Sequence, residues 1–131
     1  MPAEAVWALV QQPATFQWVA WPLLAARGPM PARWEQGCIV ELRLLGLGVL
    51  PLWRQQIEIV ELDHGRRILA TEEKAVVFRR WRHRISVAPE GAAECRYADE
   101  LELDAGALTP VGALVVRAFF GWRQRRWRTL A

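Results

Sequence analysis

Several residue types that mark a specific class of protein are scarce in this chain. Its 131 residues include two cysteines, Cys38 and Cys95, and a single lysine, Lys74. Two isolated cysteines without a recognisable spacing predict reduced thiols in a cytoplasmic protein, not a disulfide framework. The two histidines, His64 and His83, are both distant from the cysteines in sequence, so we expect no metal site.

A membrane segment and a leader peptide are also not expected. The stretch 5–26 carries no charge, but it is interrupted by glutamines, a threonine and prolines (Gln11, Gln12, Pro13, Thr15, Gln17 and Pro22). A membrane-spanning helix needs about 20 mostly apolar residues. A secretory signal would start with positive charge, whereas Glu4 is the only charged residue nearby.

Apolar and aromatic residues are abundant. They predict one globular domain over residues 1–131, because hydrophobic residues make up 53% of the chain and eight are tryptophan. A chain of this length can bury a core without disulfides or metals. A buried tryptophan brings a large ring and an N–H that needs a partner, so eight of them indicate a thick core or an aromatic-lined cavity.

Helical patterns lie at the two ends of the chain. Pro2 and Glu4 suit the first turn of a helix that ends at Pro13, and a second short helix is expected over 15–20. A long helix is predicted over 108–130. Its expected buried stripe is Leu108, Val111, Val115, Ala118 and Trp122. Phe120 and Trp127 would then face away from the sheet.

Five strands are predicted between these helices from alternating apolar and polar residues. Their ranges are 38–44, 55–59, 67–72, 80–87 and 95–104. A three-residue loop at 63–65, with Gly65 in a left-handed conformation, would place Ile59 opposite Leu69.

The residue patterns of the last two strands predict how these strands pair with each other. If Val87 faces Cys95, His83 faces Asp99 on the inner side of the sheet. On the outer side, Arg82 then meets Glu100 and Arg80 meets Glu102, and such cross-strand ion pairs are favourable. The arginines of this strand are therefore expected to be paired with acids, which argues against nucleic-acid binding.

The order of these elements, with several motifs, resembles the helix-grip fold of START-like SRPBCC proteins, which include polyketide cyclases and lipid carriers. Pro2-Ala3-Glu4-Ala5-Val6-Trp7 resembles the opening helix of that family. Trp81-Arg82-His83-Arg84-Ile85 and Tyr97-Ala98-Asp99-Glu100-Leu101 resemble two central strands, and Arg123-Gln124-Arg125-Arg126-Trp127 resembles the C-terminal helix. The resemblance implies an α+β fold in which a curved antiparallel sheet wraps around the long helix.

The family also has a strand before its first helix, and this chain begins at the helix. Without that strand, 38–44 and 95–103 would each lose a neighbour. Unpaired strand edges promote association, so we expect either a homodimer through a sheet edge or lower stability than a form extended upstream.

A site is expected between the sheet and the long helix. Its predicted lining is Trp81, His83, Tyr97, Asp99 and Trp122, with Leu42 and Ile57 as apolar walls. One interpretation is a cavity that binds a small hydrophobic ligand such as a lipid, a polyketide or an aromatic compound. The alternative is a cyclase or dehydratase with His83 and Asp99 as an acid/base pair. The same pair could instead be a purely structural contact. No cofactor is expected, because nucleophile motifs and phosphate-binding glycine loops are absent from the sequence.

Overall fold

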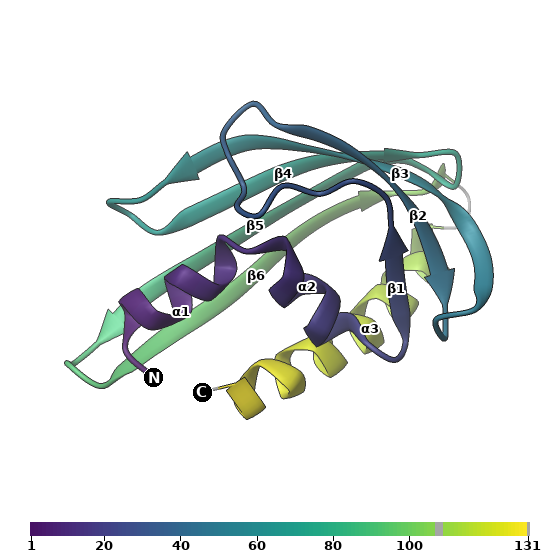
Figure 1. Ribbon diagram of the computed structural model, residues 1–131. Helices are drawn as coiled ribbons and strands as arrows, with labels where there is room; N and C mark the ends of the chain where they lie inside the picture. The colour runs from purple at the N-terminus through teal and green to yellow at the C-terminus, as the bar shows by residue number, and fades with distance from the viewer. Residues whose placement is uncertain (107–108, 131) are drawn as a thin grey trace.

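The chain folds into a curled antiparallel sheet with three helices on its concave side (Figure 1). The computed structural model describes residues 1–106 and 109–130. The helices are α1 (Ala3–Val10), α2 (Pro13–Ala20) and α3 (Thr109–Leu130). The strands are β1 (Leu24–Arg27), β2 (Ile39–Gly46), β3 (Leu50–Asp63), β4 (Ile68–Ala75), β5 (Phe78–Glu90) and β6 (Glu94–Asp104). The predicted α+β helix-grip architecture is confirmed.

The strands form a meander in which each one pairs with the next in sequence. The register shifts by one residue at three places, between Arg43 and Leu45, between Ile59 and Glu61, and between Glu73 and Ala75. Such bulges bend a strand and increase its twist. They explain how a simple meander curls around the helices.

The alternation in the sequence decides which side chains face inward. Ile59, Leu69, Ile85 and Val87 are almost fully buried on the concave face. Arg82 and Arg84 lie on the convex face, where they pair with acids on neighbouring strands: Arg82 with Glu72 at 3.0 Å and Glu102 at 4.0 Å, and Arg84 with Glu100 at 3.6 Å. Arginines of the basic strand do pair with acids, as expected, but both predicted pairs, Arg82 with Glu100 and Arg80 with Glu102, are wrong.

The partners differ because the β5–β6 hairpin has a register shifted by two residues from the prediction. Val87 faces Tyr97, so His83 lies opposite Leu101 and not opposite Asp99. The reason is the turn: Glu90 still pairs with Glu94, and the loop is 91–93, where Gly91 has a φ of 80°. A shift by two keeps every side chain on its predicted face.

The β3–β4 turn also differs from the prediction. It spans 64–67, and the left-handed residue is Arg67, with a φ of 53°, and not Gly65. Together with the bulge at Val60, this turn places Ile59 opposite Thr71, where Leu69 was expected.

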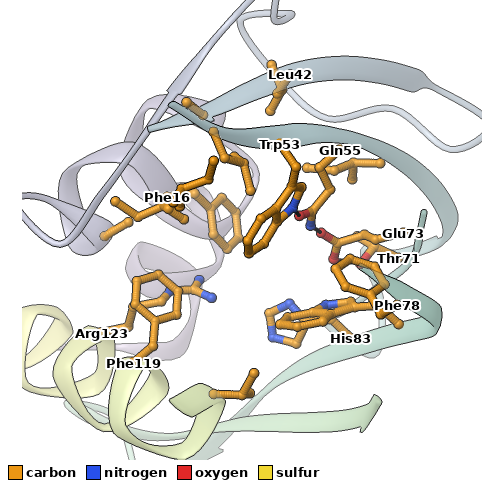
Figure 2. A pocket seen from close by; sticks show the side chains of 18 of the residues that line it. Phe16, Leu42, Trp53, Gln55, Thr71, Glu73, Phe78, His83, Phe119 and Arg123 are labelled. Carbon is orange, nitrogen blue, oxygen red and sulfur yellow. Dashed lines mark hydrogen bonds between the residues drawn. The ribbon is translucent and has the colours of Figure 1, made fainter. Parts of the chain in front are cut away.

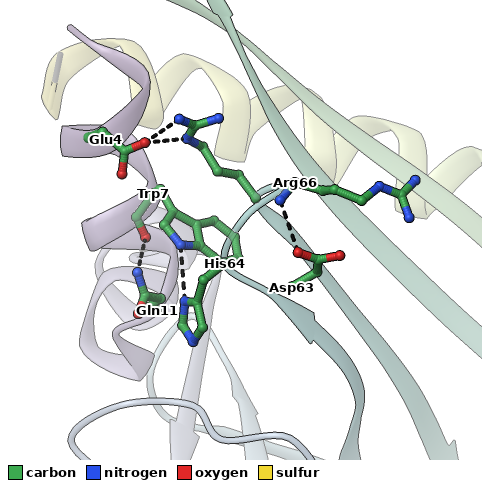
Figure 3. Close-up of polar contacts among 7 residues, drawn as sticks. Glu4, Trp7, Gln11, Asp63, His64 and Arg66 are labelled. Carbon is green, nitrogen blue, oxygen red and sulfur yellow. Dashed lines mark hydrogen bonds and ion pairs between the residues drawn. The ribbon is translucent and has the colours of Figure 1, made fainter.

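Contacts with this turn hold α1 in place (Figure 3). The Nε1–H of Trp7 donates to Nδ1 of His64 at 3.3 Å, and Glu4 forms an ion pair with Arg67. Trp7 is itself buried in the core, so the first helix is fixed both by packing and by polar contacts.

A short strand that the sequence analysis missed covers one edge of the sheet. Leu24–Arg27, where no strand was predicted, forms β1 and pairs with β2. β1 pairs with Arg43 and Leu44 of the predicted strand 38–44, so the prediction that this strand would lack a neighbour is wrong for these two residues. Within the described residues, 39–42 pair only with β3. Among the described residues, β6 pairs only with β5. Self-association through a sheet edge stays a prediction; within the described residues the two outer strands, β1 and β6, each pair with one neighbour only.

The long helix forms, but its buried face differs from the predicted one. Phe120 and Trp127 are each 7% exposed, whereas Val111 and Val115 are 63% and 62% exposed. The packed face lies on a different side of the helix and contains Phe120, Arg123 and Trp127. Leu108, which was also assigned to the buried stripe, lies outside the described residues. None of the described helices is both long and apolar enough to cross a membrane.

Candidate functional site: a cavity between the sheet and the helices

A cavity of about 730 Å³ lies between the concave face of the sheet, α2 and α3 (Figure 2). Its walls are mostly apolar. The sheet contributes Leu42, Leu44, Ile57, Leu69 and Ile85, and the helices contribute Phe16, Val116 and Phe119. The cavity occupies the space that a packed core would otherwise fill, which explains why the first half of α3 is exposed.

The mouth of the cavity is at the first half of α3. Val111 and Val115 line the cavity and are largely exposed, and Leu52 of β3 and Val77 of the β4–β5 turn line it and are each 44% exposed. The second half of α3 closes the other end, because Phe120 packs edge-on against His83, with 5.0 Å between ring centroids. The cavity therefore has an open apolar end and a closed end.

One wall carries a chain of polar side chains on β3 and β4. Trp53 Nε1 donates to Gln55 Oε1 at 3.1 Å, the Gln55 amide donates to Glu73, and Thr71 Oγ1 donates to Glu73 Oε2 at 2.7 Å. Gln55, Thr71 and Glu73 are all buried. Since the Gln55 and Thr71 donors are both directed at Glu73, its carboxylate is held as an acceptor beside an apolar space.

A second polar group lies on β5 and β6. His83 lines the cavity, and its Nε2 lies 2.7 Å from Asp99 Oδ1. The Tyr97 hydroxyl donates to the same oxygen at 3.0 Å, and Gln124 of α3 approaches Asp99 Oδ2 at 3.4 Å. His83 and Asp99 are diagonal neighbours on one face, close enough for direct contact although they are not opposite each other.

This arrangement changes the acidity of two groups. Burial alone would raise the pKa of Asp99, but the hydrogen bond and charge of His83, the charge of Arg123 and the bond from Tyr97 outweigh burial and lower it. Burial and the neighbouring Asp99 charge raise the pKa of the Tyr97 hydroxyl well above its usual 10.0. Asp99 is thus held as an anion and Tyr97 as a neutral donor.

A buried arginine completes the site. Arg123 of α3 is only 6% exposed and lines the cavity, and Figure 2 shows its guanidinium directed into it. The rings of Phe120, Phe16 and Phe119 surround its Cζ at 4.6, 5.2 and 5.9 Å. The site therefore has a buried cation on the helix and a buried carboxylate, Glu73, on the opposite wall.

The structure brings together only some of the residues that the sequence predicted for this site. Trp81, His83, Leu42 and Ile57 line the cavity. Asp99 lies behind His83, and Tyr97 lines a separate hollow with Trp127. Trp122 faces elsewhere, because its Nε1 donates to the Trp21 carbonyl at 3.3 Å.

Sequence reasoning missed Arg123, Gln55 and Glu73. Gln55 had a usable signal, since it alternates in phase with the apolar Ile57 and Ile59 and so occupies a core-facing position. Arg123 had one as well: it follows Phe120 by three residues and precedes Trp127 by four, which places it on their helix face. Glu73 had no such signal, because it lies beyond the predicted end of its strand.

The part of the chain that the structure describes contains no group of three or more His, Cys, Asp or Glu side chains that could hold a metal ion. The chemistry available is thus that of one imidazole–carboxylate pair, one buried carboxylate and one buried guanidinium beside an apolar space.

Two solved structures share this fold. Protein CV1439 from Chromobacterium violaceum is 13% identical, with a TM-score of 0.76 over 98% of this chain and 88% of its own. Protein Ms6760 from Mycobacterium smegmatis is 14% identical, with a TM-score of 0.72 over 98% of this chain and 83% of its own. A search of curated proteins finds no match. The model of a family described as a domain of unknown function (DUF8410) matches residues 1–130, and the chain therefore belongs to this family.

Proposed function

We propose that the protein binds a small hydrophobic ligand, such as a lipid, a polyketide or an aromatic compound, in the cavity between the sheet and α3. The observation that carries this proposal is the cavity of about 730 Å³, with apolar walls and a few buried polar groups. Ligand sites typically measure about 300–1,000 Å³ and combine an apolar lining with a small number of polar anchors.

Two further features support binding. The apolar mouth formed by Val111, Val115 and Val77 gives a hydrophobic ligand a route into the interior. The helix-grip-like fold also agrees with the resemblance to START-like SRPBCC proteins. As part of the proposal, we place this chain in that superfamily. Members of that superfamily include lipid carriers and polyketide cyclases.

An uncharged fluorescent probe, N-phenyl-1-naphthylamine, tests the proposal. We expect its emission to rise on binding to the wild-type protein and to fall when lauryl alcohol displaces it. Val116→Trp should weaken binding at least tenfold, because Val116 lines the cavity and a larger ring would obstruct part of it. Ala113→Trp is the matched control, since Ala113 is exposed on the same helix. Equal probe binding by both variants, or none by the wild type, would reject the proposal.

The second candidate is a cyclase or dehydratase, and one observation favours it. His83 lines the cavity, and Asp99 contacts it from behind, so the carboxylate orients the imidazole ring toward the cavity. Proton transfer by a positioned side chain contributes about 10²–10⁴-fold to a rate. A thioester of a linear poly-β-ketone would be the substrate to test. Cyclisation that His83→Gln slows a hundredfold, with probe binding retained, would support the enzyme, whereas equal rates for the two proteins would exclude this role.

A further inference from the structure

The guanidinium of Arg123 is a buried positive charge, and two of its nitrogens lack a hydrogen-bond acceptor within the described residues. Among the described residues, neither its Nε nor its Nη2 has a partner, and water does not reach either atom. Buried polar groups are almost always hydrogen-bonded, and a buried charge without a partner is rare. The side chain adjoins the open space of the cavity, and a ligand would reach these two donors only after the guanidinium rotates out from among the phenyl rings around it.

The surrounding groups compensate this charge only in part. Three phenyl rings attract the cation through their faces, but a ring face is a weak acceptor for an N–H group. The charge of Arg123 acts on Asp99 and lowers its pKa, yet Arg123 forms no salt bridge within the described residues. Asp99 already accepts hydrogen bonds from His83 and Tyr97.

Another arginine in the same structure shows which acceptor such a pair of donors can bind. Arg67 donates from its Nε and Nη2 to a single carboxylate oxygen, Oε1 of Glu4. These are the two nitrogens that lack partners on Arg123. A planar guanidinium matches a carboxylate with two parallel hydrogen bonds, which is the geometry in which arginine binds anions most strongly.

We propose that the ligand of this cavity is an apolar carboxylic acid, with its carboxylate on Arg123 and its apolar body extended toward the mouth. This inference rests on the proposed function. Val111 at the mouth precedes Arg123 by twelve residues, so the body has about 18 Å along the helix. Glu73 on the opposite wall repels a carboxylate, and it thereby favours a single orientation of the acid (Figure 2).

Matched ligands that differ only in charge test the inference. Dissociation constants for lauric acid and methyl laurate are measured at pH 8, where the acid is ionised, by displacement of N-phenyl-1-naphthylamine. We expect the wild type to bind the acid at least tenfold more tightly than the ester. Arg123→Met removes the charge while keeping an apolar side chain, and it should reduce this ratio to about one. Arg125→Met removes an exposed charge from the same helix and should leave the ratio unchanged.

The outcomes separate the two proposals. Equal binding of acid and ester by the wild type would overturn the acid inference and leave the hydrophobic site intact. Binding of neither ligand, and no binding of the probe, would reject the site itself. If Arg123→Met does not fold, the wild-type ratio still decides, and Arg123→Lys should keep a preference for the acid because it keeps the cation. A preference that persists in a folded Arg123→Met would also overturn the inference.

Discussion

Removing the carboxylate of Asp99 should destabilise the protein markedly. In Asp99→Ala, the buried Nε2 of His83 and the hydroxyl of Tyr97 both lose their acceptor. A buried polar group without a partner costs about 1–3 kcal/mol, so two of them cost roughly 2–6 kcal/mol. The entropy of unfolding is about 2.1 cal/mol/K per residue. For 131 residues, a loss of about 3 kcal/mol therefore lowers Tm by about 11 °C.

Differential scanning calorimetry and urea unfolding at pH 7 measure this loss. Glu100→Ala is the matched control, because Glu100 is the next residue on the same strand and its pair with Arg84 is exposed. Exposed pairs contribute about 0–1 kcal/mol. Asp99→Asn should lie between the two, since its carbonyl oxygen remains an acceptor. If Asp99→Ala and Glu100→Ala had the same Tm, Asp99 would not be the buried acceptor described here.

Three further predictions follow from the same structure. The lowered pKa of Asp99 means that its charge stabilises the folded state above its ordinary pKa of 3.8 and stops doing so as the pH falls through the lower folded-state value. The stability difference between wild type and Asp99→Asn should therefore be constant near pH 7 and shrink below about pH 4 in urea titrations. Phe120→Ala should cost about 3–5 kcal/mol and Val115→Ala less than about 1 kcal/mol, because only Phe120 is buried. If urea unfolding showed a larger loss of stability for Val115→Ala than for Phe120→Ala, the buried helix face would be the one predicted from the sequence. Gly121→Ala should stabilise the protein by up to about 1 kcal/mol, since its added Cβ meets nothing within 4 Å. Gly48→Ala should instead lower Tm, because Gly48 has a φ of 77° and its Cβ would lie 2.7 Å from the Trp21 ring; a Tm unchanged or higher would contradict this.

The strand patterns carried much of the fold because each side chain on a strand has only two directions to point. Ile85 and Val87 alternate with Arg82 and Arg84, and this alone placed them on the correct faces. The exact pairing needed the turn, which a pattern of period two cannot locate: a shift by two residues satisfies both faces equally well. The four-residue strand β1 was too short to show any period, and its pairing with β2 comes from tertiary contact.

The helix presented a harder problem, because apolar residues occur on more than one side of it. Val111, Val115 and Ala118 form a regular stripe, and so do Val116, Phe120 and Trp127. The sequence contains both stripes and offers no means of choosing between them. Packing of Phe120 against His83 and of Trp127 against Tyr97 selects the second stripe, and it leaves the first at the cavity and its mouth.

The sequence by itself determined the α+β class, the order of the main elements, and the placement of His83 and Asp99 on the inner face of the sheet. The reason is that local periodicity and residue type act over a few neighbouring positions. Only the tertiary structure decided that a cavity remains between the sheet and α3, and that Arg123 and Glu73 lie buried in its walls. Both features depend on how far the helix lies from a sheet curved by three bulges. That distance results from many contacts between residues far apart in the chain, so the sequence of no single segment determines it.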